Sequence, residues 1–204
     1  MNPRQSAERA SPDPEPLHRR AAEDLSFIRD TMARTVPFTA VPGWGGFLMG
    51  LTAFPAAWFA SGREVQAEWL AVWLAEAVIA LGIGGVAFVR KAERTQTPLL
   101  STAGKQFVGN FAPPVVAGAL LTPVFYHAGL TEHLAGLWLL LYGTGVTTAG
   151  AFSVRIVPVL GLSLMLLGGL ALALAPAFAD LFMALGFGGL QVAFGLVIAR
   201  KYGG

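Results

Sequence analysis

The sequence contains no cysteine, which excludes disulfide bonds, thiol catalysis, iron–sulfur clusters and a cysteine-linked lipid anchor. Charged residues are also scarce, at 13% of the chain, against about 25% in soluble domains. The net charge is only +2, so no basic excess favours a nucleic-acid partner. These shortages leave a membrane protein as the class that the composition favours.

Long apolar runs dominate the chain. Hydrophobic residues make up 54% of it, and the mean hydropathy is +0.60. A membrane span needs about 20 mainly apolar residues, and six stretches qualify: about 43–61, 67–89, 107–126, 133–152, 156–175 and 179–199. Prolines within them are compatible with spans, because neighbouring helices can satisfy the backbone groups that a proline frees. The sequence therefore predicts an all-α, polytopic transmembrane helical bundle with six spans, whose first partner is the lipid bilayer.

The basic residues predict the orientation of this bundle. Of the 14 lysines and arginines, only Arg63 falls on the side that carries the turns after the first, third and fifth spans. Because cytoplasmic loops carry the positive excess, both termini are expected in the cytoplasm. The expected location is the inner membrane of a cell, crossed several times.

The two ends of the chain lie outside the predicted spans. Residues 1–16 are polar and rich in proline and are expected to be disordered, and no apolar run in the first 42 residues predicts a cleavable signal peptide. Residues 17–36 carry one apolar stripe at helical spacing, which includes Leu25, Ile28 and Met32, and predict an amphipathic cytoplasmic or interfacial helix. It is expected to form a collar over the bundle, or to dock onto the bilayer, a second copy of the chain or another membrane protein. Residues 200–204 form a short cytoplasmic tail.

A glycine-rich string occurs twice, as ALGIGG at 80–85 and ALGFGG at 184–189. Neither copy has the lysine or the ribose-binding acid that a phosphate loop requires. Small residues four apart instead allow membrane helices to approach closely. Three pairs with this spacing are candidate packing positions: Ala80 with Gly84, Gly145 with Ala149, and Ala184 with Gly188.

The strings belong to a wider similarity between the ends of the chain. VPGWGGFLMGL from Val41 and VPVLGLSLMLL from Val157 share the frame V-P-x-x-G-x-x-L-M-x-L, and each precedes a span that carries the glycine string. We expect tandem helical hairpins that all start from the cytoplasm, as in transporters with parallel repeats. The alternative is a chance match of glycine- and leucine-rich segments.

The stretch 27–52, FIRDTMARTVPFTAVPGWGGFLMGLT, resembles an uncharacterised family of six-span bacterial integral membrane proteins. The resemblance implies six spans and brings no function with it.

Glu76 is the one carboxylate well inside a predicted span. An ionisable residue near the bilayer midplane is costly and is a functional candidate by default. On helical spacing, Gln191 of the sixth span and Tyr142 and Thr144 of the fourth reach a similar depth. We expect these four residues to form a polar layer, in which Glu76 either exchanges a proton or holds a cation, or serves as a protonated carboxyl that links helices.

The remaining polar residues predict no catalytic or cofactor site. His127, Glu132 and His133 flank one external turn, where they are weighed as a surface metal site but favoured as ordinary interfacial side chains. No histidine lies deep enough in a span to bind a haem, and no serine has a base at its depth. Enzymatic activity is therefore disfavoured, and no cofactor is expected.

Two functions stay open from the sequence. Six spans and hairpin repeats favour a transporter or channel for a small solute or an ion. The small size and the cytoplasmic amphipathic helix favour a non-transporting sensor or an accessory or assembly subunit. A polar cavity would favour transport, and a sealed core with an exposed apolar flank would favour the second function.

Overall fold

The computed structural model describes residues 24–28, 41–94, 102–151, 153–174 and 178–202. The chain divides into two compact units, 1–36 and 37–204. In the first unit, residues 24–28 form a short helix, on which Leu25 and Ile28 are exposed in the single chain. Met32, the tail 1–16 and most of the predicted helix 17–36 lie outside the described residues, so the docking of this helix stays a prediction.

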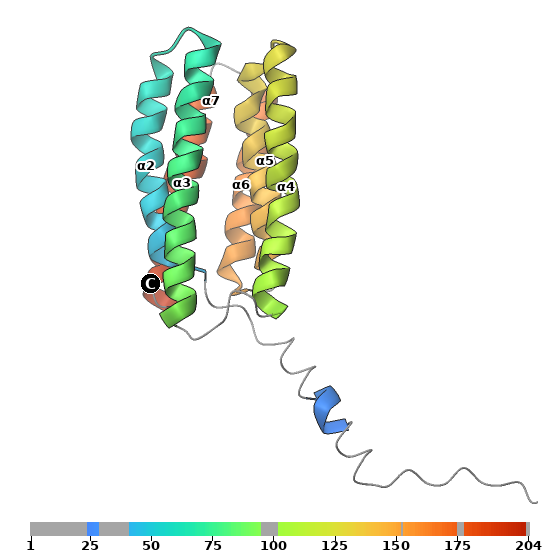
Figure 1. Cartoon of the computed structure of the whole chain (residues 1–204). Helices are drawn as coiled ribbons and strands as arrows, with labels where there is room; N and C mark the ends of the chain where they lie inside the picture. The colour runs from blue at the N-terminus through green and yellow to red at the C-terminus, as the bar shows by residue number, and fades with distance from the viewer. Residues whose placement is uncertain (1–23, 29–40, 95–101, 152, 175–177, 203–204) are drawn as a thin grey trace, which may run out of the picture. The chain divides into compact units, whose positions relative to one another are not determined.

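The second unit is built from helices in all of its described parts (Figure 1), which confirms the all-α class. Its first elements are α2 (Gly43–Ser61), α3 (Gln66–Arg94), α4 (Thr102–His127) and the 3₁₀ turn η1 (Thr131–His133). The later elements are α5 (Leu134–Gly150), α6 (Ile156–Leu174), α7 (Ala179–Met183), the π-helical stretch η3 (Ala184–Leu190) and α8 (Gln191–Tyr202). The last three elements form one continuous helix over Ala179–Tyr202.

Within the described residues, four helices are long and apolar enough to cross a membrane: α3, residues Gly104–His127 of α4, α6, and the helix Ala179–Tyr202. The two other long helices, α2 and α5, do not meet this requirement of length and hydropathy. α5 has only 17 residues. The 19 residues of α2 include Pro55 and several glycines, which lower its mean hydropathy.

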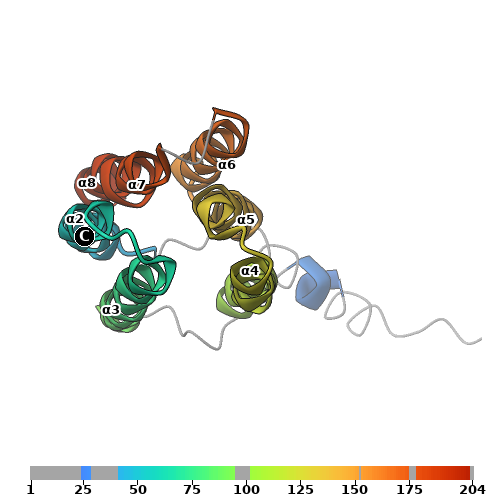
Figure 2. The ribbon, with the colours of Figure 1, turned by 90° about the horizontal axis from the view of Figure 1, so that it is seen from above.

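Seen from above in Figure 2, the helices of this unit follow one another around the bundle in the order α3, α2, α7–α8, α6, α5, α4. α2 packs against α3 and α8, and α5 packs against α4 and α6. The pairs α2–α3 and α4–α5 are thus hairpins, as the predicted tandem repeat requires. The third pair differs, because α6 packs mainly on α5, and α8 packs mainly on α2.

The residues matched by the predicted repeat have different partners for this reason. A Cβ atom on Gly45 would lie 2.6 Å from Cβ of Ala87 on α3, whereas one on Gly161 would lie 2.7 Å from the carbonyl O of Gly143 on α5. The sequence frame is real, but its two copies make unlike contacts. A packing arrangement of three equivalent hairpins is therefore not what the chain adopts.

Glycines at seven-residue spacing bring α5 and α6 into close contact. A Cβ atom on Gly143 would lie 2.7 Å from the carbonyl O of Gly161, and one on Gly136 would lie 2.9 Å from the carbonyl O of Gly168. No side chain larger than hydrogen fits at these positions without moving a backbone. The spacing of seven keeps the glycines on one helix face along the whole contact.

Glycines at seven-residue spacing also bring α2 into close contact with the last helix. A Cβ atom on Gly43 would lie 2.8 Å from the carbonyl O of Gly195, and one on Gly50 would lie 2.8 Å from the carbonyl O of Gly188. Gly43 and Gly50 are again seven residues apart, as are Gly188 and Gly195. Each side of the bundle is therefore held by one pair of helices in close backbone contact.

α4 contains three prolines, Pro113, Pro114 and Pro123. Pro114 has no N–H to donate to the carbonyl O of Asn110. The hydroxyl of Thr148 on α5 lies 3.0 Å from that carbonyl oxygen and can donate to it. The neighbouring helix thus satisfies a backbone group that a proline frees, which is how membrane helices tolerate this residue.

Candidate functional site

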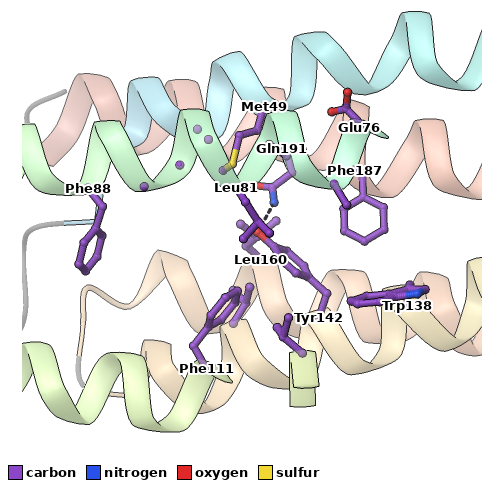
Figure 3. Close-up of a pocket in the computed structure, with 18 of the residues that line it drawn as sticks. Met49, Glu76, Leu81, Phe88, Phe111, Trp138, Tyr142, Leu160, Phe187 and Gln191 are labelled. Atoms are coloured by element: carbon purple, nitrogen blue, oxygen red, sulfur yellow. Dashed lines mark hydrogen bonds between the residues drawn. The ribbon is translucent and has the colours of Figure 1, made fainter. Parts of the chain in front are cut away.

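A cavity of about 440 Å³ lies within the helical unit, with walls from α2, α3, α4, α5, α6, η3 and α8 (Figure 3). Its lining is almost entirely apolar. Besides tryptophan indoles, the side chains that bring polar atoms to it are Glu76, Tyr142 and Gln191. A volume of this size, lined by apolar groups and a few polar ones, is typical of sites for small organic molecules.

A chain of aromatic rings runs along the cavity from α3 to η3. The ring centroids of Phe88 and Phe107 are 5.7 Å apart, and Phe107 stacks in turn on Phe111 at 6.4 Å. Phe111 contacts Tyr142 edge-on at 5.5 Å, and Tyr142 contacts Phe187 at 5.2 Å. We call these five residues the aromatic wall. Its rings fix one another in preferred edge and stacked geometries, so the wall has a defined shape.

At the end of the cavity near the α2–α3 turn, two indoles of α3 meet one carboxylate. The Nε1–H of Trp69 donates to Oδ1 of Asp180 at 2.7 Å, and the Nε1–H of Trp73 lies 3.4 Å from the same oxygen. Asp180 is in the first turn of α7, where the helix dipole favours a negative charge. This cluster connects α3 to the last helix.

At the opposite end, Lys91 of α3 is buried. Its Nζ donates to the carbonyl O of Val41 at 2.9 Å and lies 3.3 Å from the carbonyl O of Tyr202. Val41 precedes α2, and Tyr202 is the last residue of α8. One ammonium group therefore joins three helix ends.

Glu76 is 8% exposed and bonds to α2. Oγ1 of Thr52 lies 2.8 Å from Oε1 of Glu76 and also 2.8 Å from the carbonyl O of Met49. A threonine hydroxyl carries one hydrogen and can accept as well as donate. Both contacts are satisfied together if a protonated Glu76 donates to Thr52, which then donates to Met49. The geometry thus favours the protonated, helix-linking carboxyl of the two roles expected for Glu76.

Tyr142 and Gln191 meet near the middle of the cavity, as Figure 3 shows. Nε2 of Gln191 donates to the hydroxyl O of Tyr142 at 2.9 Å. Thr144 does not join them, because its hydroxyl donates to the carbonyl O of Leu140 in its own helix at 2.8 Å. Of the four residues expected in a polar layer, two are hydrogen-bonded to each other, Glu76 lines the same cavity with a different partner, and Thr144 lies outside the lining.

The residues predicted to pack between helices differ in their contacts and burial. Gly145 lies against α4, where a Cβ atom would be 3.0 Å from the carbonyl O of Phe111, and Gly188 lies against the ring of Phe54 on α2. Ala149 is fully buried, whereas Ala184 is partly buried.

Ala80 and Gly84 have a role different from the expected helix contact. Both line the cavity, and the nearest neighbour of a Cβ atom on Gly84 would be the sulfur of Met49, at 3.0 Å. In the part of the chain that the structure describes, no backbone atom of another helix lies within 4 Å of that Cβ position. Small residues on a helix face leave room as readily as they allow contact, and sequence spacing does not distinguish the two.

Several residues of the site were missed by sequence reasoning. Lys91 counted there only among the basic residues that predict orientation, and no role was predicted for Asp180. The signal for Asp180 was available, since Trp69 and Trp73 are four residues apart and present two indole donors on one face of α3. The glycines spaced by seven were also visible in the sequence, whereas the predicted packing pairs have a spacing of four.

The histidines show no metal cluster. His133 and Glu132 are adjacent, with 3.7 Å between Nδ1 and Oε1, and His127 contacts Tyr126 edge-on instead. Among the described residues, no group of three potential ligands is close enough to hold a metal ion.

Comparisons with protein families, with curated proteins and with solved structures found no match to this chain.

Proposed function

We propose that the chain is a six-span integral membrane protein of the inner membrane that carries a small, mostly apolar solute through its cavity. The observation that carries the proposal is the apolar cavity with three polar side chains inside a bundle of membrane-type helices. A polar cavity would have favoured transport of an ion or a hydrophilic solute, and the lining is instead almost entirely apolar. Transport of a lipophilic molecule fits the lining better.

The packing of α2 and α5 supports six spans. Each lies between two helices that are apolar enough to cross the membrane. The low hydropathy of α2 comes with the small residues through which it packs, since its buried positions are all glycine or alanine. At 1.5 Å per residue, the 19 residues of α2 span about 28 Å, close to the thickness of a bilayer core.

A topology experiment tests this arrangement. Reporter domains fused after Gly62 and after Gly129 are expected to read external, and one fused after Thr97 cytoplasmic, because 13 of the 14 basic residues then face the cytoplasm. Two further reporters, one at the N-terminus and one after Arg155, complete the pairs of sites on either side of α2 and α5. If α2 or α5 did not cross the bilayer, the sites on its two sides would give the same reading. The opposite reading at all three sites would reverse the orientation.

Blocking the cavity tests the function. Ala80→Phe places a ring in the lining, whereas Ala75→Phe puts the same ring at an exposed position of α3 outside the lining. In proteoliposomes, counterflow of a panel of labelled lipophilic solutes is expected to identify at least one exchanged solute. Its rate should fall at least tenfold in Ala80→Phe and stay near wild type in Ala75→Phe. Equal rates in both variants would contradict transport through the cavity.

The second candidate is a sensor or accessory subunit. The observation that favours it is the internal pairing of the cavity's polar groups, Thr52 with Glu76 and Tyr142 with Gln191, which suits a site that binds without moving its ligand. A solute that binds the wild type but not Ala80→Phe, and that shows no counterflow, would support this candidate over transport.

A further inference from the structure

At the centre of the cavity, two donor hydrogens and one acceptor have no hydrogen-bond partner among the described residues: the second amide hydrogen of Gln191, the hydroxyl hydrogen of Tyr142 and the carbonyl Oε1 of Gln191. Gln191 is 5% exposed and donates its first amide hydrogen to Tyr142. Buried polar groups are normally paired, so these three atoms are available for a ligand.

The charge of the lining restricts that ligand. Among the residues that line the cavity, Glu76 is the one acidic side chain, and no lysine, arginine or histidine is present. The carboxyl of Glu76 is already bonded to Thr52 on α2. An anionic ligand would have no countercharge, and a cationic one would require Glu76 to lose the proton that it donates to Thr52. A neutral ligand meets neither cost.

The cavity also opens on the outer surface of the bundle. Leu81 of α3 lines it while being 65% exposed, and Val108 of α4 lines it while being 51% exposed. In a membrane this surface faces lipid, since both helices are apolar enough to span. A ligand can therefore enter from the hydrocarbon layer between α3 and α4.

We propose that the cavity binds a neutral amphiphile that enters from the bilayer between α3 and α4. Its single hydroxyl group accepts from Tyr142 and donates to Gln191. Its apolar body lies along the aromatic wall. This proposal rests on the proposed function and names the substrate class of the same site.

Three fluorescent probes with the same four-ring body test the headgroup. They are 1-pyrenemethanol, pyrene and the cationic 1-pyrenemethylammonium. Binding to the full chain in lipid nanodiscs is measured by energy transfer from the tryptophans, of which Trp69, Trp73 and Trp138 line the cavity. The alcohol is expected to bind about 30-fold more tightly than pyrene, since its hydroxyl makes two hydrogen bonds that contribute about 1 kcal/mol net each.

Variants connect this preference to the two residues. Tyr142→Phe and Gln191→Leu each remove one of the two hydrogen bonds and should reduce the preference for the alcohol to about fivefold while pyrene binding is retained. Thr144→Val is the matched control, because Thr144 lies outside the lining, and it should keep the full preference.

The outcomes separate this proposal from the proposed function. If Ala80→Phe leaves pyrene binding unchanged, the cavity is not the binding site and both fail. If Ala80→Phe blocks binding but alcohol and pyrene bind equally, the neutral amphiphile is refuted and the cavity site stands. If the ammonium probe binds most tightly and Glu76→Gln removes that preference, the ligand class is cationic and this proposal is overturned.

Discussion

Gly161→Ala is expected to lower the thermal unfolding midpoint in detergent by roughly 5–10 °C. The added methyl would lie 2.5 Å from the backbone N of Thr147 and 2.7 Å from the carbonyl O of Gly143. Backbone atoms of a packed helix cannot turn aside as a side chain can, so α5 and α6 must separate. Overpacking of this kind costs about 1–3 kcal/mol, and each kcal/mol shifts the midpoint of a chain of this size by about 2–4 °C.

The same helix offers a matched control. A Cβ atom on Gly169 meets nothing within 4 Å, so Gly169→Ala adds a methyl group with no clash. Alanine is favoured over glycine in a helix by about 0.5–1 kcal/mol, and this variant should be as stable as the wild type or slightly more so. If both variants unfold at the wild-type temperature, the close contact between α5 and α6 is not a source of stability.

Thr52→Val is expected to destabilise the protein by about 1–3 kcal/mol, because it leaves the buried carboxyl of Glu76 without its partner. The double variant Thr52→Val/Glu76→Leu, which removes both polar groups, should recover most of that loss. Glu76→Gln should be close to the wild type, since its amide can donate to Thr52 as a protonated carboxyl does. Together with the single variant Glu76→Leu, the wild type, Thr52→Val and the double variant form a double-mutant cycle in detergent unfolding, and Glu76→Gln is a fifth protein that serves as a conservative control.

The protonation of Glu76 has a separate readout. Infrared spectra at neutral pH should contain the carbonyl band of a protonated carboxylic acid, and Glu76→Gln should lack it. A spectrum without that band would show that Glu76 is ionised and that Thr52 donates to it. Glu76 would then be the proton- or cation-exchanging group of the alternative interpretation.

The helices were predictable from the sequence because each is a long apolar run with turn residues at its ends. α2, for example, covers Gly43–Ser61, and residues 43–61 were predicted from composition alone. The partners of each helix were not predictable in the same way. Gly45 and Gly161 occupy equivalent positions in the sequence frame but contact different helices. Which neighbour a small residue approaches depends on the whole arrangement and not on local pattern.

The sequence predicted how deep the polar residues of the candidate site lie in the bundle, but not which of them form hydrogen bonds with each other. The expected layer contained Tyr142 and Gln191, which are hydrogen-bonded to each other. It also contained Thr144, whose hydroxyl bonds to its own helix, as threonine commonly does in apolar surroundings. Thr52, the partner of Glu76, was overlooked because a single hydroxyl in a span carries no sequence signal. Helical spacing gives the level of a residue, whereas the partner depends on how far each helix is rotated about its axis.

The π-helical stretch Ala184–Leu190 has a consequence for that rotation. Gln191 is the first residue after it, and π turns contain more residues than the 3.6 of an α-helix. The direction of the Gln191 amide is therefore set by local winding of the helix and not only by its rotamer. If this stretch adopted regular α geometry, the residues after it would rotate about the helix axis, and the amide of Gln191 would move away from Tyr142. The π-helical stretch is thus part of what places the amide of Gln191 against Tyr142.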